Sequence, residues 1–182
     1  LSVLWTMEST FPFYQNSGWE AVASQGWVFS VQPSDAGLFE RHPFDLVQYE
    51  PGDSAQLDDI IRIHEREPQR ISRSRSEFEA LLSLPKTATL LATRGSETAG
   101  YLTYGWASNK TGLFEAGGDP AAVETMVRRA LDTVFWGFET QVVVPLASCV
   151  LGSLLNARLP SSKRLVEDAA GIGQQMHRVN DL

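Results

Sequence analysis

Two stretches of this 182-residue chain hold groups that could do chemistry. The first is "FPFYQNSGWE", where Tyr14 brings a hydroxyl close to an Asn-Ser-Gly break. The second is "EAGGDPAAV", where the carboxylate of Glu115 stands beside Gly117 and Gly118. A carboxylate can accept a proton, and free backbone N–H groups ahead of a helix can bind an anion. The rest of the sequence has to position these four candidates.

Each candidate also has an explanation that needs no ligand. Asp119 follows the glycines and precedes Pro120, so its carboxylate can cap a helix and satisfy the free donors itself. Tyr14 is equally well explained as an aromatic side chain that packs between a helix and a sheet, with its hydroxyl at the rim. His64 lies on the apolar face of a predicted helix, which favours a packed, hydrogen-bonded core residue over a catalyst.

Composition excludes several classes of protein. A net charge of -7 and a pI near 4.9 argue against a surface that binds nucleic acid or an anionic membrane. No apolar run approaches the roughly 20 residues that a bilayer-spanning helix needs. One cysteine and three histidines leave no zinc-like spacing and no internal disulfide, so we expect no metal and a reducing, cytoplasmic setting.

Basic residues gather in "RISRSRS", which contains Arg70, Arg73 and Arg75. Glutamates flank the cluster on both sides, among them Glu67 and Glu77. This pattern favours a solvated face of salt bridges over a phosphate site.

Turn-forming residues in "QPSDAGLFERHP" separate two parts of the chain. We therefore predict a division into residues 1–36, a linker at 37–43, and residues 44–182. The first part is expected to hold a strand over 1–8, a short helical turn that ends at Gly18, and a strand or hairpin over 19–32.

The second part predicts a mixed α/β fold. We expect a strand at its start, a helix capped by Asp53 or Ser54, and a second helix opened by a capping box of Ser76 and Glu79. The remaining predicted elements are a hairpin over 87–106, a strand over 111–118, a helix from Asp119, a strand over 140–146, a helix over 149–159 and a final strand from 174. The helix from Asp119 would be a crossover that makes its two flanking strands a parallel pair.

This order of elements resembles the fold of the GNAT acyltransferases. The opening "VLWTMESTFPFYQNSGWEAV" is similar to the closing part of such a domain, whose short helix carries the pattern Phe-Tyr-x-x-x-Gly-Phe/Trp. The matching positions are Phe13, Tyr14, Gly18 and Trp19. The resemblance implies that residues 1–36 are the C-terminal portion of one GNAT-like domain and residues 44–182 a second one, as in tandem members whose first domain is truncated.

The resemblance also implies a function, the transfer of an acetyl group from acetyl-CoA to a primary amine on a small molecule. Tyr14 would then be the acid for the departing thiolate, Glu115 would lie where a base can lie, and Gly117 and Gly118 would face the pyrophosphate. The signature Gln/Arg-x-x-Gly-x-Gly/Ala is absent, so the second domain looks degenerate. The alternative is a non-catalytic GNAT-like module that scaffolds a partner or a catalytic copy.

The apolar strand over residues 1–8 would expose an edge that has to pair. We expect either a homodimer that exchanges strands or packing of the N-terminal segment onto the chain's own second part.

Overall fold

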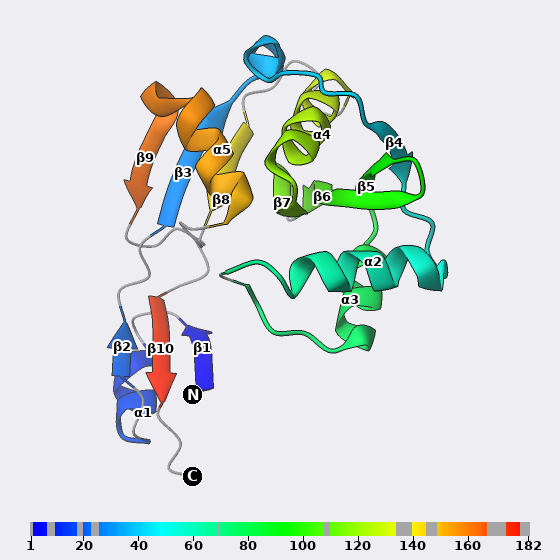
Figure 1. Cartoon of the computed structure of the whole chain (residues 1–182). Helices are drawn as coiled ribbons and strands as arrows, with labels where there is room; N and C mark the ends of the chain where they lie inside the picture. Colours follow the sequence, from blue (N-terminus) through cyan, green and yellow to red (C-terminus); the bar gives the residue numbers. More distant parts are fainter. Residues whose placement is uncertain are drawn as a thin grey trace.

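The computed structural model contains three antiparallel sheets with helices around them (Figure 1). It describes residues 2–6, 10–17, 20–22, 26–68, 70–107, 110–133, 140–144, 149–166 and 174–178. The predicted left-handed Gly18 and the matching Trp19 lie outside the described residues.

The largest sheet has four strands in the order β4-β5-β6-β7. Its strands are β4 (Asp45–Gln48), β5 (Thr87–Arg94), β6 (Glu97–Ala107) and β7 (Lys110–Gly118). The predicted hairpin is confirmed, since β5 pairs antiparallel with β6. The sheet separates two layers of helices, which are α2 (Ser54–His64) with α3 (Arg75–Leu82), and α4 (Pro120–Thr133).

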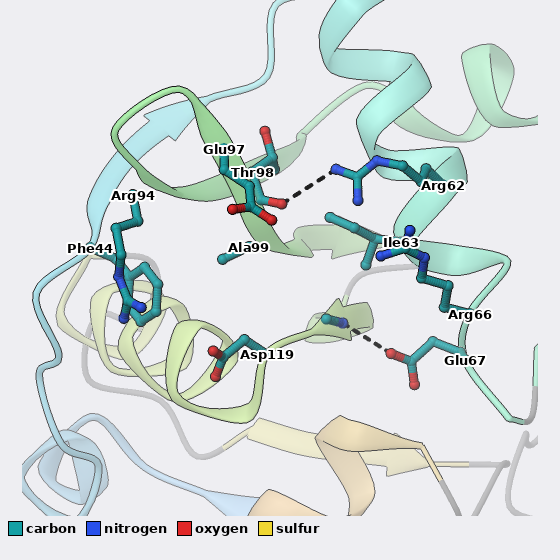
Figure 2. Close-up of a pocket in the computed structure, with 11 residues that line it drawn as sticks. Phe44, Arg62, Ile63, Arg66, Glu67, Arg94, Glu97, Thr98, Ala99 and Asp119 are labelled. Atoms are coloured by element: carbon teal, nitrogen blue, oxygen red, sulfur yellow. Dashed lines mark hydrogen bonds between the residues drawn. The ribbon is translucent and has the colours of Figure 1, made fainter.

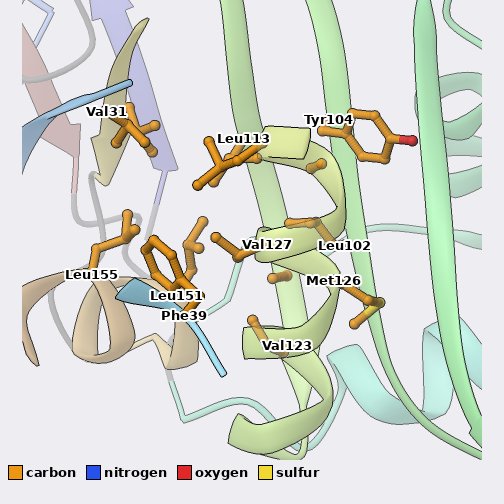
Figure 3. Packing of buried hydrophobic residues seen from close by; sticks show 14 of the residues in the cluster. Val31, Phe39, Leu102, Tyr104, Leu113, Val123, Met126, Val127, Leu151 and Leu155 are labelled. Carbon is orange, nitrogen blue, oxygen red and sulfur yellow. The ribbon is translucent and has the colours of Figure 1, made fainter. Parts of the chain in front are cut away.

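A hydrophobic cluster fills each side of this sheet. On the α4 side, Val123, Met126 and Val127 pack with Leu102 and Leu113 (Figure 3). On the other side, the apolar faces of α2 and α3 pack with strand residues. That second cluster contains Tyr49, Leu57, Ile60, Ile63, Phe78, Leu82, Leu91 and Tyr101.

A β-bulge in β7 decides which side its residues face. Thr103 pairs with Glu115 and Tyr104 pairs with Leu113, so Phe114 is the extra residue. The bulge breaks the alternation, because Leu113 packs in the α4 cluster while Glu115 faces the α2 layer. Without it, both side chains would point to the same side of the sheet.

The helix starts follow the capping rules, with one shift. Asp53, one of the two predicted caps, caps α2 by accepting from two backbone N–H groups, and Asp119 accepts from Ala121 at the start of α4 as predicted. The capping box of α3 is formed by Ser74 and Glu77. The predicted box of Ser76 and Glu79 was wrong by two residues, because both pairs have the same spacing in a sequence that repeats serine.

The two three-stranded sheets each combine the two ends of the chain. In one, β10 (Gln174–Arg178) lies between β1 (Ser2–Thr6) and β2 (Glu20–Val22). In the other, β3 (Gly26–Val31) lies between β8 (Thr140–Val144) and β9 (Lys163–Val166). The N-terminal segment therefore packs onto the chain's own C-terminal part. A homodimer stays a prediction.

The predicted strand or hairpin over 19–32 is found as two strands that do not pair with each other. Strands β2 and β3 both exist, but β2 pairs with β10, and β3 pairs with β8 and β9. Local sequence shows two strands with a break between them, while their partners come from more than 100 residues away. Strand β9 was not predicted at all.

The predicted parallel pairing of β7 with β8 is not found among the described strands. Strands β7 and β8 lie next to each other, but they belong to different sheets. Among the described strands, every pairing is antiparallel. Strand β8 instead takes β3 as its hydrogen-bonding partner.

The segment between the two predicted parts is held against α4. It begins with a 3-10 helix, Pro33–Leu38. The N–H of Glu40 donates to Glu124, and Arg128 donates to the carbonyl of Phe39. The predicted division at 37–43 stays a prediction, and within that segment Phe39 is the residue that is buried.

α1 (Phe11–Gln15) lies beside β2, and α5 (Val150–Arg158) packs near α4 and β7. Within the described residues, no helix has the length and apolar character to cross a membrane. The same residues contain no group of three His, Cys, Asp or Glu side chains arranged to hold a metal ion.

Candidate functional site

Glu115 belongs to a buried polar network between β7 and the α2–α3 layer. Its carboxylate lies 2.7 Å from Arg73 Nη1 and 3.2 Å from His64 Nδ1. The hydroxyl of Tyr101 donates to Glu115 Oε1 at 2.8 Å and lies 3.0 Å from His64 Nδ1. His64 Nε2 lies 2.8 Å from the carbonyl oxygen of Ile71. The network ties the segment after α2 to the centre of the sheet.

Both ring nitrogens of His64 face acceptors, which favours the doubly protonated imidazolium. Nε2 faces the Ile71 carbonyl and Nδ1 faces the Glu115 carboxylate. Burial by itself lowers the pKa of His64, but the hydrogen bonds to Glu115 and Ile71 outweigh it and raise that pKa. The prediction that His64 is a packed, hydrogen-bonded residue is confirmed, since only 4% of it is exposed.

Two cationic partners surround the single carboxylate of Glu115. Burial favours the neutral acid, but the hydrogen bond from His64 and the charge of Arg73 outweigh it and hold the pKa of Glu115 below its usual range. Burial and the adjacent Glu115 charge raise the pKa of Tyr101. Glu115 is thus an ionised partner in a structural ion pair, which makes it a poor proton acceptor near neutral pH.

Arg73 departs from the sequence prediction. Its side chain is 14% exposed, so it does not belong to a solvated face. Arg70 and Arg75 do lie on the surface, where Arg75 pairs with Asp58. The pattern could not reveal which of the three arginines turns inward, because the buried carboxylate that attracts Arg73 lies on β7.

Carboxylates of this chain occupy the junction between β7 and α4. The N–H of Gly118 donates to Glu67 Oε1 at 2.9 Å. The N–H of Ala121 donates to Asp119 Oδ1 at 2.8 Å, and the N–H of Asp119 donates to the carbonyl of Ala99. An incoming anion would meet two like charges at the helix start.

Gly118 is required here for steric reasons of its own. Its φ of +105° belongs to the region that favours glycine. An added Cβ would lie 2.3 Å from the carbonyl oxygen of Ala99. The glycine therefore allows the close approach of β7 to β6, whether or not a ligand binds nearby.

Solved structures give this arrangement of elements a family context. A GCN5-related N-acetyltransferase from Kribbella flavida superposes with a TM-score of 0.64 at 13% identity over 96% of this chain and 42% of its own. One from Anabaena variabilis gives 0.60 at 15% identity over 96% and 44%. A conserved protein from Enterococcus faecalis gives 0.65 at 12% identity over 97% and 44%. This chain has the GNAT fold.

The resemblance read from the sequence is therefore confirmed for the GNAT fold. No family model matches the sequence, and no curated protein matches it. The chain spans less than half the length of the three structures named above. A truncated first domain and a degenerate second one stay predictions.

The residues at the β7–α4 junction do not fit the pyrophosphate that the GNAT resemblance implies. Glu67 and Asp119 already accept from the backbone donors there, and both bring negative charge. The assignment of Gly117 and Gly118 to cofactor binding stays a prediction, and these contacts argue against it.

Tyr14 is not brought together with Glu115. It lies half-buried on α1, 5.1 Å from Phe13 between ring centroids in an edge-to-face contact. Figure 1 shows α1 beside the β1-β10-β2 sheet, well away from β7. If both residues take part in catalysis, they cannot do so in one site of this GNAT-fold chain.

Three residues that shape the site were missed as site residues. They are Glu67, Arg73 and Tyr101. Tyr101 offered one signal, because a tyrosine hydroxyl on a buried strand needs a polar partner. Glu67 offered none, since it lies just beyond the C-terminus of α2 and its partner is a backbone N–H some 50 residues later.

Proposed function

We propose that this chain is a non-catalytic GNAT-fold module of an N-acyltransferase that transfers an acetyl group from acetyl-CoA to a primary amine. The observation that carries the proposal is the hydrogen bond from Gly118 N–H to Glu67 Oε1. It places a carboxylate of the chain where the resemblance implies a phosphate. The module's role is then to support a partner or a catalytic copy.

The polar network supports the same proposal. A base for the amine would have to be unprotonated and free to accept a proton. Glu115 is unprotonated but not free, because it accepts from Tyr101 and pairs with Arg73 and His64. Its contacts are those of a structural group.

Isothermal titration with acetyl-CoA and with free CoA tests this function. We expect no binding by the chain at millimolar ligand. Glu67→Ala is expected to bring free CoA binding into the measurable range, because it frees the Gly118 donor. Glu65→Ala removes the same charge from a neighbouring exposed residue and is expected to leave binding undetectable. Micromolar binding by the unaltered chain would overturn the proposal.

A second candidate function rests on α1. Tyr14 lies on a short helix between β1 and β2, as the resemblance requires for the acid that protonates the thiolate. The chain would then supply the acid to a site completed elsewhere in a longer protein. Tyr14→Phe is expected to lower kcat of such a protein by about 100-fold while Km changes little. An unchanged kcat would reduce Tyr14 to a packing residue.

A further inference from the structure

A pocket of about 410 Å³ lies at the end of the four-stranded sheet, and Glu67, Gly118 and Asp119 of the β7–α4 junction form part of its wall. It opens between the C-terminal half of α2, the β5–β6 hairpin and the start of α4 (Figure 2). Ile63 and Ala99 contribute apolar lining, and three arginines take part in the wall, namely Arg62, Arg66 and Arg94. Its size is within the range of small-molecule sites.

Some of the charges around this pocket are already paired. Arg62 Nη2 donates to Asp59 Oδ1 at 2.9 Å, and Thr98 donates to the other oxygen of Asp59. The carboxylates of Glu67 and Asp119 accept from backbone N–H groups, as described above. Glu67 and Asp119 keep their negative charge, so the anionic groups of a ligand would have to lie on the arginines and away from these two carboxylates.

Arg66 and Arg94 are the cations that remain. In the part of the chain that the structure describes, the Arg66 guanidinium makes no hydrogen bond or ion pair. Arg94 has its guanidinium 4.6 Å from the ring centre of Phe44, a stacking contact that orients the group without using its N–H donors. The sole unpaired carboxylate among the lining residues is that of Glu97.

The two cations flank an apolar floor. Figure 2 shows Arg94 with Phe44 on one side of the pocket and Arg66 on the other, with Ala99 and Ile63 between them. An acidic chain of net charge -7 has no general surplus of cations that would explain this pair. Guanidinium groups bind carboxylates in a two-pronged manner, and the floor suits a short carbon chain.

We propose that this pocket binds a small dicarboxylate, with one carboxylate on Arg66 and the other on Arg94. The apolar lining contacts the carbon chain between them. The pocket shares Glu67, Gly118 and Asp119 with the β7–α4 junction, but the proposed ligand contacts are made by Arg66 and Arg94, so the inference does not rest on the proposed function.

Isothermal titration with succinate, glutarate and adipate tests the site, with acetate and inorganic phosphate as comparison ligands. One dicarboxylate is expected to bind at least about tenfold tighter than acetate, because it makes two charge-assisted contacts where acetate makes one. Arg66→Gln and Arg94→Gln are each expected to weaken it by about tenfold or more. Phosphate binding as tight as the best dicarboxylate would overturn the assigned ligand class.

Two control variants distinguish a direct contact with the ligand from a change in the overall charge of the protein. Arg70→Gln removes one positive charge from an exposed residue outside the pocket lining, and it is expected to change affinity less than twofold. Glu97→Gln is expected to tighten binding, because it removes a like charge from the rim. The proposal fails if no dicarboxylate binds at a ligand concentration of about 10 mM, where even weak specific binding would be detected. It also fails if Arg70→Gln weakens binding as much as Arg66→Gln, or if Glu97→Gln weakens it.

Discussion

Two glutamates of this protein, Glu115 with a side chain 19% exposed and Glu124 with one 7% exposed, have the same kinds of partner in different surroundings. Glu115 on β7 contacts His64 and Arg73, and Glu124 on α4 contacts His42 and Arg158. The side chains of His64 and Arg73 are 5% and 14% exposed. Those of His42 and Arg158 are 28% and 34% exposed. The first cluster lies between the sheet and the α2–α3 layer, and the second lies where α4 meets the segment at 39–42 and the end of α5.

The residue types in an ion pair therefore do not by themselves decide how much the pair contributes to the free energy of unfolding. Removing one member of a buried pair leaves a charge that water cannot reach, whereas partners at an edge can be rehydrated. The Glu115 cluster should therefore control the stability of the fold. The Glu124 cluster should control how firmly the segment at 39–42 is held to α4.

The largest effect is expected for Glu115→Gln. It leaves Arg73 and protonated His64 without their shared counter-charge, which should cost about 3–5 kcal/mol of unfolding free energy. Urea unfolding at pH 7 measures it. The double variant Glu115→Gln, Arg73→Met should lose less than the sum of the single losses. If Glu115→Gln loses less unfolding free energy than Glu124→Gln does, the ranking of the two clusters is wrong.

Glu124→Gln should have the second-largest effect, about 1–3 kcal/mol, because it weakens charge-assisted bonds to partly exposed partners. The amide can still accept from Glu40 N–H. Limited proteolysis should show faster cleavage after Arg41 in this variant, as its neighbours loosen. Unchanged cleavage together with normal stability would mean that Glu124 does not hold the segment.

The pH dependence of the unfolding free energy tests whether His64 is charged in the folded protein. Its folded pKa is raised above the ordinary value of 6.5, so its contribution is complete below that pH and is lost as pH rises through the folded pKa. The difference in unfolding free energy between the natural chain and His64→Gln should shrink from pH 6 to pH 9. In the Glu115→Gln background this decline should vanish, since burial then opposes the charged ring. A difference that stays constant in the natural background would contradict the imidazolium assignment.

The smallest effect is expected for Asp132→Asn. Asp132 pairs with Arg41, whose side chain is 68% exposed, so the loss should stay within about 0.5 kcal/mol. Thermal unfolding of Asp132→Asn and Glu124→Gln, two variants on the same helix, measures the two losses side by side. A loss comparable to that of Glu124→Gln would show that the surface pair, and not the buried carboxylate, anchors the segment.

Local sequence was enough for most elements of the second part. Asp53 and Asp119 mark helix starts because a cap depends on neighbours within three residues. The hairpin of β5 and β6 follows from alternation and a tight turn. The GNAT resemblance, drawn from the order of these elements, holds for the fold.

The sequence by itself determined most of the segments that become helices and strands, though not β9, and that His64 lies inside, since these depend on short-range periodicity and capping. The tertiary structure alone decided that β10 pairs with β1 and β2, while β3 pairs with β8 and β9. It also decided that the bulge at Phe114 turns Glu115 toward α2, and that Arg73 is the arginine that pairs with Glu115. Those outcomes depend on tertiary partners such as Arg73 with Glu115 and Ser2 with Arg178, and no local pattern records the burial that makes such contacts favourable.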